Sequence, residues 1–166
     1  MSDIDQSKGN NPHAELDEID KSILRILQAD AKKNVKEISA EIGITKTPIY
    51  ERIKRLERIG VISNYVALID IRRIMSSLTV FCAVTLDVQK ADHIEAFAGA
   101  IGEMSEVTEC YLAGGGFDFL LKVVVNDLDA YHEFASHRLA ALPNVSTIKS
   151  SFVLSEFKHS TVSPLI

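Results

Sequence analysis

Apolar residues recur at helical spacing in three short segments of the first third of the chain. The first segment follows Asp17, a residue type that caps helices, and runs to about Gln28. The second segment follows Asn34 and the third follows Thr45, two further capping residue types. Each segment places its apolar residues on one helix face. These residues are Ile19, Ile23, Ile26 and Leu27 in the first segment, Val35, Ile38 and Ile42 in the second, and Ile49, Ile53 and Leu56 in the third. The pattern predicts a core of three packed helices.

The stretch from Asn34 to Gly60 predicts two of these helices joined by a tight turn. Gly43 supplies the permissive backbone that ends one helix, and Pro48 falls in the first turn of the next, where its missing N–H costs no hydrogen bond. Opposite the apolar stripe, the later helix carries Thr47, Glu51, Lys54, Arg55 and Arg58. A glycine turn followed by a helix with a basic outer face is the helix-turn-helix plan, whose second helix enters the DNA major groove. An ordinary helical hairpin with a solvated charged face has the same local pattern.

The distribution of charge favours the DNA-binding interpretation. The whole chain has a formal net charge of −5, which by itself argues weakly against nucleic acid. Residues 31–73, however, hold 10 basic and 5 acidic side chains, a local charge of +5, whereas the segments on either side are acidic. Phosphate binding requires positive charge at the binding surface. The basic segment coincides with the candidate helix-turn-helix, so we expect double-stranded DNA as a partner.

Residues 61–70, VISNYVALID, mix β-branched and aromatic residues around a Ser63-Asn64 turn signal. A short β element directly after the second helix predicts a wing. We therefore expect a winged helix-turn-helix domain at 16–66 and a linker at 67–77. Residues 1–15 lack the apolar core of a signal peptide and are expected to be a disordered tail.

The remaining residues, 78–166, predict an α+β domain. A strand with alternating side chains is followed by a helix that Gly102 closes, two strands separated by a glycine run, a second helix capped by Asn126 or Asp127, and a last strand. The predicted strands cover 78–86, 107–112, 117–125 and 145–157, and the helices contain 94–101 and 131–142. The order βαββαβ is the ferredoxin-like fold, an antiparallel sheet with both helices on one face. Because the other face also carries apolar residues, dimerisation through the sheet is expected.

Signals for other functions are weak. The glycine run lacks the sequence of a phosphate loop or a dinucleotide fingerprint, and the five histidines show no zinc spacing. Cys82 and Cys110 suit buried, reduced thiols in a cytoplasmic protein, and no apolar run is long enough to span a bilayer. We therefore expect no metal, no cofactor and no membrane partner. A small-molecule enzyme built on a ferredoxin-like dimer remains a minor alternative.

Four collinear stretches resemble one family. They are LDEIDKSILRIL at 16–27, ITKTPIYERIKRLERIGVI at 44–62, ECYLAGGGFDFLLKV at 109–123 and LPNVSTIKSSFVL at 142–154. The chain resembles the leucine-responsive/asparagine-synthesis regulators (Lrp/AsnC, the feast/famine regulators) from Leu16 to about Pro164. The resemblance implies a cytoplasmic, nucleoid-associated prokaryotic transcription regulator. It also implies a homodimer that assembles further, for example into an octamer, and an amino-acid effector, such as leucine or another aliphatic amino acid, bound between subunits.

The resemblance places the turn and recognition helix at 35–54. The residues expected nearest to DNA are Thr45, Lys46, Thr47, Tyr50, Arg52, Lys54 and Arg55. Cap hydroxyls and helix N-terminal amides suit phosphates, and long side chains suit the groove. Many family members have Pro or Ser where this chain has Lys46, which adds positive charge at the helix start. For Arg52, a packing and salt-bridge role is the alternative.

The family's effector loop, typically Gly-Asp-Tyr/Phe-Asp-Tyr, matches the stretch from Gly115 to Phe119. The expected effector-binding residues are Gly115, Gly116, Phe117, Asp118 and, from a second motif, Ser150. Glycine amides suit a carboxylate and an Asp suits an α-ammonium group. The chain departs from the family because Gly116 replaces its first Asp and because only Ser150 keeps a hydroxyl of the family's Thr-x-Thr. Turn-forming glycines and a turn-capping Asp118 are the structural alternatives. An architectural DNA-binding protein without an effector is the functional alternative.

Overall fold

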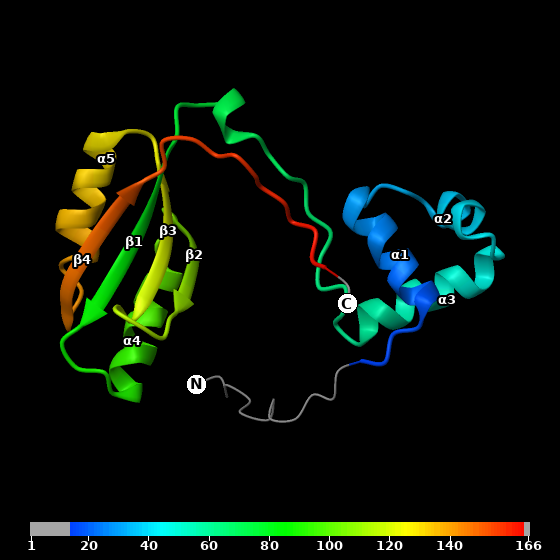
Figure 1. Cartoon of the computed structure of the whole chain (residues 1–166), viewed down its shortest axis with the longest axis horizontal. Coiled ribbons are helices and arrows are strands. Elements are labelled where there is room, and N and C mark those ends of the chain that lie inside the picture. Colours follow the sequence, from blue (N-terminus) through cyan, green and yellow to red (C-terminus); the bar gives the residue numbers. More distant parts are fainter. Residues whose placement is uncertain (1–13, 165–166) are drawn as a thin grey trace. The chain divides into compact units, whose positions relative to one another are not determined.

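The computed structural model describes residues 14–164. It divides into two compact units, one formed by the chain up to Leu68 together with the segment from His159, and one formed by Ile69–Lys158 (Figure 1). The predicted disordered tail at 1–15 lies almost wholly outside the described residues. Among the residues described, no helix is long and apolar enough to cross a membrane.

The first unit is a bundle of three helices. They are α1 (Glu18–Ala29), α2 (Val35–Ile42) and α3 (Lys46–Arg58). The predicted apolar stripes meet in a core that excludes water almost completely, with Ile23, Ile38, Ile49 and Leu56 at 0% exposure. The three-helix core expected from the apolar spacing is confirmed.

Local hydrogen bonds explain where these helices begin and end. Asp17 and Asn34 each form a capping box with the residue three positions later, which satisfies amides that lack helical partners. Gly43 ends α2 with a φ of 78°, in the left-handed region that glycine tolerates best. Thr45 occupies the N-cap position of α3, but its hydroxyl makes no capping hydrogen bond, so the expected side-chain cap is absent.

The predicted β element after α3 is wrong for the single chain. Residues 61–70 contain no strand, and a short 3₁₀ helix, η1 (Ile71–Arg73), follows them. The residue types favour an extended backbone, but a strand needs a neighbouring strand to pair its N–H and C=O groups. No segment within 14–164 supplies that neighbour. The result is an extended segment with exposed apolar side chains, including Val66, Leu68 and Ile69 at 68–70% exposure.

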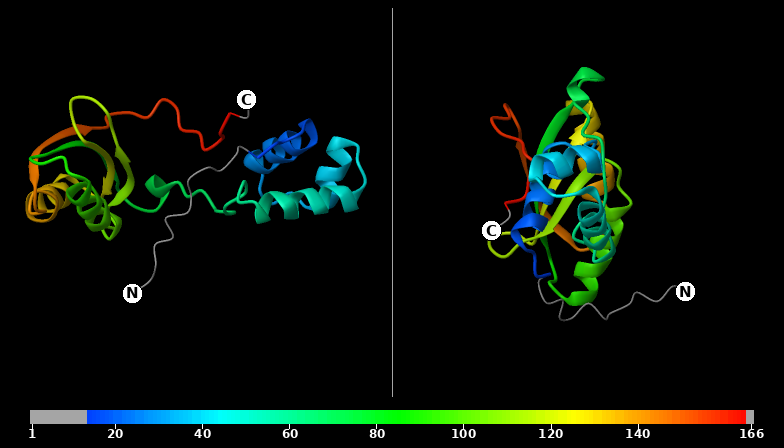
Figure 2. Two further views of the ribbon diagram at one scale, coloured as in Figure 1. Left: turned by 90° about the horizontal axis from the view of Figure 1, so that it is seen from below. Right: turned by 90° about the vertical axis from the view of Figure 1, so that its right-hand side faces the viewer.

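The second unit has the predicted βαββαβ order. Its elements are β1 (Leu78–Leu86), α4 (Ala91–Gly102), β2 (Val107–Leu112), β3 (Phe119–Val125), α5 (Leu128–Glu133) with a π-helical continuation (Phe134–Leu139), and β4 (Val145–Phe152). The sheet order is β2-β3-β1-β4, and neighbouring strands are antiparallel. Both helices lie on one face of the sheet (Figure 2). The ferredoxin-like fold is confirmed.

Three predicted boundaries in this unit are displaced. β4 ends at Phe152 rather than at residue 157: the Val153 amide still donates to the Thr79 carbonyl of β1, but the described residues after it belong to no strand. β3 begins at Phe119 rather than at residue 117, since the preceding residues form a loop. Gly102 is still part of α4 and has no positive φ, so it does not end the helix as predicted. Glu103 takes the C-cap position.

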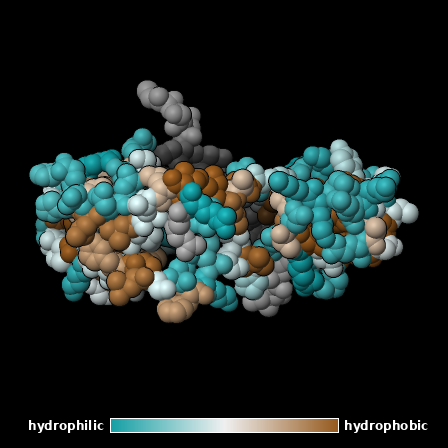
Figure 3. Space-filling model, turned by 90° about the horizontal axis from the view of Figure 1, so that it is seen from above, coloured by the Kyte–Doolittle hydropathy of each residue, from teal (hydrophilic) through white to brown (hydrophobic). Residues whose placement is uncertain are grey.

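The two faces of the sheet differ sharply in burial. Val80, Cys82 and Val84 of β1 point toward the helices at 0% exposure, and α5 contributes Tyr131 to the same core. The expected burial of the cysteines is confirmed for Cys82 and wrong for Cys110 of β2, which is exposed. The opposite face stays partly accessible and carries apolar groups on both central strands. Its members include Thr79, Phe81, Ala83 and Thr85 of β1 and Leu120, Lys122 and Val124 of β3. Hydrophobic groups also interrupt the polar surface of this unit in Figure 3.

Candidate nucleic-acid interface and effector loop

The N-terminus of α3 is open and free of negative charge. Its first turn contains no acidic residue, and the hydroxyl of the N-cap residue Thr45 is not used by the helix. Lys46 and Thr47 are exposed in that turn. A helix N-terminus carries unpaired amides and a positive dipole end, so this turn suits a phosphate.

The exposed side of α3 beyond this turn is aromatic and basic. Tyr50 is 52% exposed, and the Lys54 ammonium lies 5.9 Å from the centroid of its ring. Lys54 also lies 2.8 Å from the Glu57 carboxylate, which accepts a hydrogen bond from the Tyr65 hydroxyl as well. The ammonium of Lys54 therefore contacts both the Tyr50 ring and the Glu57 carboxylate, and its hydrogen bond to Glu57 raises the pKa of Lys54.

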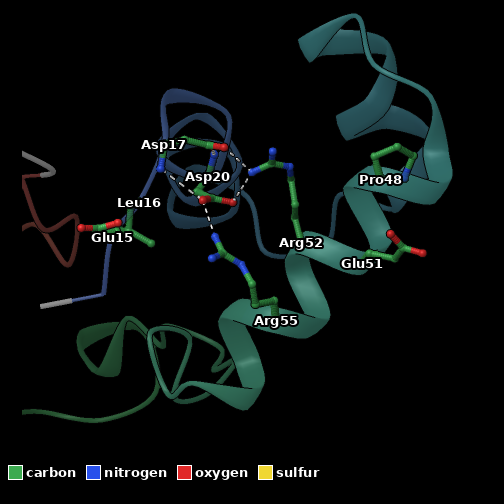
Figure 4. Close-up of a pocket in the computed structure, with 8 residues that line it drawn as sticks. All are labelled: Glu15, Leu16, Asp17, Asp20, Pro48, Glu51, Arg52 and Arg55. Atoms are coloured by element: carbon green, nitrogen blue, oxygen red, sulfur yellow. Dashed lines mark hydrogen bonds and ion pairs between the residues drawn. The ribbon is translucent and has the colours of Figure 1, made fainter. Parts of the chain in front are cut away.

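Arg52 and Arg55 have a different environment from the other predicted DNA contacts. Arg52 donates to Asp17 at 2.7 Å and to Asp20 at 2.8 Å, and Arg55 donates to the second carboxylate oxygen of Asp20. In Figure 4 both guanidinium groups point from α3 toward Asp20 on α1, whereas Glu51 points away from them. The salt-bridge alternative for Arg52 describes these contacts, and the predicted contact of either arginine with DNA stays a prediction.

Asp20 is the residue that sequence reasoning missed. Its side chain is 1% exposed, and besides the two arginines it accepts a hydrogen bond from the Asp17 amide at 3.2 Å. The spacing of Asp17 and Asp20 signals a capping box, but the arginines lie 32 and 35 residues further along the chain. No local sequence pattern predicts an ion pair between residues so far apart in the sequence.

The ion pairs also change the titration of the cap residue. The pKa of Asp17 is lowered from its usual value of 3.8, first by the hydrogen bond from the Asp20 amide and then by the hydrogen bond from Arg52. An open cleft of about 690 Å³ lies beside this cluster. It is lined by Glu15, Leu16, Asp17, Asp20, Pro48, Glu51, Arg52 and Arg55.

The predicted effector loop connects β2 to β3. The Asp118 amide donates to the Val84 carbonyl at 2.9 Å, and the Leu86 amide donates to an Asp118 carboxylate oxygen at 2.7 Å. The loop is closed by the Ala113 amide, which donates to the Asp118 carbonyl at 2.8 Å. Asp118 thus anchors the loop to the end of β1 through one oxygen, and its other oxygen makes no hydrogen bond within the described residues.

Only one of the predicted loop glycines needs glycine for its backbone. Gly115 has a φ of 146°, a conformation that other residues rarely adopt, whereas Gly116 has no such φ. A Cβ atom built at Gly116 would meet nothing within 4 Å. The turn alternative therefore accounts for Gly115 and leaves Gly116 unexplained.

Ser150 lies apart from the loop within one chain. It pairs with Cys82 in the sheet, and its hydroxyl is hydrogen-bonded to the Tyr131 hydroxyl. The Cys82 Sγ atom lies 3.2 Å from the Tyr131 hydroxyl, and burial raises the pKa of Tyr131 to about 12. The structure therefore brings Gly115, Gly116, Phe117 and Asp118 together but not Ser150.

Comparison with known proteins identifies both units. The family model for the AsnC-type helix-turn-helix domain matches residues 16–57, and the model for the Lrp/AsnC ligand-binding domain matches residues 79–163. The chain is similar to the leucine-responsive regulatory protein of Salmonella typhimurium, with 38% identity over 95% of this chain and 94% of that protein. The Serratia marcescens leucine-responsive regulatory protein is 39% identical over 90% of this chain and 91% of its own length.

Solved structures agree with this assignment. A transcriptional regulator of Neisseria meningitidis in complex with L-Met has a TM-score of 0.85 and 31% identity, covering 90% of this chain and 97% of that one. An AsnC family transcriptional regulator from Agrobacterium tumefaciens has the same TM-score and coverage and 33% identity. The chain belongs to the Lrp/AsnC family of DNA-binding, effector-responsive transcription regulators.

Proposed function

We propose that this regulator reads a specific DNA site with the N-terminal half of α3 and that an amino acid bound between subunits controls its assembly. The single observation that carries the DNA part is the open first turn of α3, which has no acidic residue and presents Lys46 and Thr47. Because the family consists of transcription regulators, the enzyme alternative is set aside.

The residues predicted from the sequence to contact DNA fall into two groups. The first group is exposed in the structure and consists of Thr45, Lys46, Thr47, Tyr50 and Lys54. Amides and hydroxyls at the helix start would bind phosphate, and the longer side chains would reach base edges in the major groove. Arg52 and Arg55 form the second group and are not part of the proposed interface, because both are bound to Asp20 and would have to leave it to reach DNA.

The proposed effector site is the loop from Gly115 to Asp118, with Ser150 supplied separately. Within the described residues, the amides of Gly115 and Gly116 donate no hydrogen bond, so they are available to an α-carboxylate. The unpaired oxygen of Asp118 could accept a hydrogen bond from an α-ammonium group. The similar Neisseria regulator is described as an L-Met complex, which supports an aliphatic amino acid here. Leucine and methionine are the first candidates.

The proposed assembly is a homodimer that associates further, for example into an octamer. The half-buried outer face of the sheet supports the dimer, since Phe81, Leu120 and Val124 lie there without a covering layer of helices. A dimer would present two α3 helices to successive major grooves of a pseudo-palindromic site. An effector bound between subunits would shift the assembly equilibrium by binding one state more tightly.

A second candidate function is an architectural DNA-binding protein that senses no effector. One observation favours it, namely that Gly116 stands where the family places an Asp. The loop would then lack one of the carboxylates that could bind an α-ammonium group.

A thermal-shift screen of the full chain against the twenty amino acids separates these two functions. A ligand that binds only the native state raises the free energy of unfolding, by about 2.7 kcal/mol at a hundredfold excess over Kd, and so raises Tm. A shift with one class of aliphatic amino acid, absent in Asp118→Ala, supports the effector loop. No shift with any amino acid, in a preparation that still binds DNA, selects the architectural function.

A further inference from the structure

Both arginines that α3 directs toward α1 are bound to one buried carboxylate. We propose that Asp20 withholds Arg52 and Arg55 from DNA phosphates, so that Asp20 is a positioning residue for sequence discrimination. This inference rests on the proposed role of α3 in DNA binding. It adds that part of the positive charge of the recognition helix is kept out of the interface.

The carboxylate of Asp20 is fully occupied by the contacts that bury it. One oxygen accepts from Arg52 at 2.8 Å, and the other accepts from Arg55 and from the Asp17 amide at 3.2 Å. At 1% exposure its charge is stabilised by these partners and hardly at all by solvent. A buried charge that loses its partner is strongly penalised, so the arginines are held more firmly than surface ion pairs would hold them.

The arrangement constrains α3 as well as its charges. Arg52 and Arg55 are three residues apart, so they project from the same side of α3 and both reach one residue of α1. Two bonds from successive helix turns to one fixed acceptor limit rotation of α3 about its own axis. The exposed residues Lys46, Thr47 and Tyr50 of the same helix are thereby held in one orientation.

This arrangement has a consequence for specificity. Arginine–phosphate contacts strengthen binding to any sequence, because the phosphate backbone carries no sequence information. Two arginines released from Asp20 would add affinity for all DNA and would loosen the orientation of the reading side chains. Asp20 therefore lowers non-specific affinity and preserves discrimination.

The test compares Asp20→Asn with Asp17→Asn in the full chain. Each variant removes one negative charge from the same helix end, and Asn is a good cap in place of Asp17. Only Asp20→Asn releases both arginines, since Asp17 contacts Arg52 alone. The probes are a duplex selected from a random pool by the wild-type protein and an unselected duplex of the same length.

For Asp20→Asn we expect the slope of log K against log salt on unselected DNA to steepen by up to about 1.8, since each new phosphate contact adds about 0.9. The affinity ratio between selected and unselected duplexes should fall at least threefold. Asp17→Asn should leave both quantities near the wild-type values. Equal slopes and equal ratios in all three proteins would overturn the proposal.

A second pair of variants keeps the proposal testable if Asp20→Asn does not fold. Arg55→Ala in the wild-type background should leave the salt slope on unselected DNA unchanged, because Arg55 does not reach phosphate there. A slope reduced by about 0.9 would show that Arg55 contacts DNA and that Asp20 does not withhold it. Lys46→Ala should reduce the slope by that amount. An unchanged slope for Lys46→Ala would instead count against the proposed DNA contacts of α3, so the two failures are distinguishable.

Discussion

At the scale of single residues, two carboxylates in α1 and its cap carry different tasks because they differ in burial. The Asp17 side chain is 52% exposed and mainly caps the helix, whereas that of Asp20 is 1% exposed and pairs with two arginines. An exposed ion pair contributes little to stability, since water and salt screen it. The buried carboxylate has no such alternative and must stay paired. We therefore expect a substitution of Asp17 to cost less folding stability than a substitution of Asp20.

The pKa of Asp17 gives a direct measure of this cap. The pKa is lowered from 3.8, chiefly by the Asp20 amide, so the stability that the cap contributes is present above pH 3.8 and is lost as the pH falls through the lower folded-state value. We expect carboxyl NMR titration to place Asp17 below 3.8. In Arg52→Ala the pKa should rise but remain below 3.8, because the amide hydrogen bond persists. An Asp17 pKa of 3.8 or above in the wild type would contradict the capping geometry.

At the scale of elements, apolar spacing and capping residues were sufficient where the causes are local. The stripe of Ile49, Ile53 and Leu56 and the caps at Asp17 and Asn34 place the three helices of the first unit. Predictions failed where the cause is distant in sequence. Residues 61–70 form no strand because no neighbouring strand in the described part of the chain pairs with them, and the positions of Arg52 and Arg55 depend on Asp20.

The loop between β2 and β3 shows the same division. Its glycines were visible in the sequence, but only the backbone separates Gly115, which needs glycine, from Gly116, which does not. The anchoring of Asp118 by the Leu86 amide likewise follows from the pairing of β1 with β3 and from no local motif. The site could therefore be predicted as a loop, and the role of each residue in it could not.

Gly116→Asp restores the residue that the family places in the effector loop. We expect Tm to change by no more than a few degrees, because the backbone at Gly116 is compatible with a side chain and a Cβ atom meets no neighbour within 4 Å. The amino acid that gives the largest thermal shift should bind more tightly in isothermal titration, since a second carboxylate can accept from its ammonium group.

Gly115→Asp is the matched control for that substitution. It introduces the same side chain one residue earlier, where φ is 146°, and should cost about 1–3 kcal/mol of unfolding free energy. Equal stability losses in the two variants, measured by urea denaturation, would contradict the backbone assignment of the loop. Unchanged ligand affinity in a stable Gly116→Asp protein would count against the effector role of this position.

At the scale of the whole molecule, each unit leaves apolar groups that its own core does not use. The extended segment after α3 exposes Val66, Leu68 and Ile69, and the sheet presents Phe81 and Leu120 on the face without helices. Soluble monomers rarely leave contiguous apolar area uncovered. We expect a second copy of the chain to supply a matching surface through twofold symmetry, which is the common form of protein assembly.

Leu120→Glu tests whether the outer face of the sheet is the dimer interface. Leu120 lies on the central strand β3 of that face, beside Ala83 of β1. A buried carboxylate without a partner is strongly disfavoured, so the variant should weaken the dimer at least a hundredfold in sedimentation equilibrium. Ala96→Glu adds the same charge at an exposed position of α4 on the other side of the sheet and should leave association unchanged.

Loss of the dimer in Leu120→Glu should also weaken binding to a two-half-site duplex, because two recognition helices must act together. A dimer of undiminished stability would remove the sheet from the interface and leave the exposed segment after α3 as the surface to be tested next.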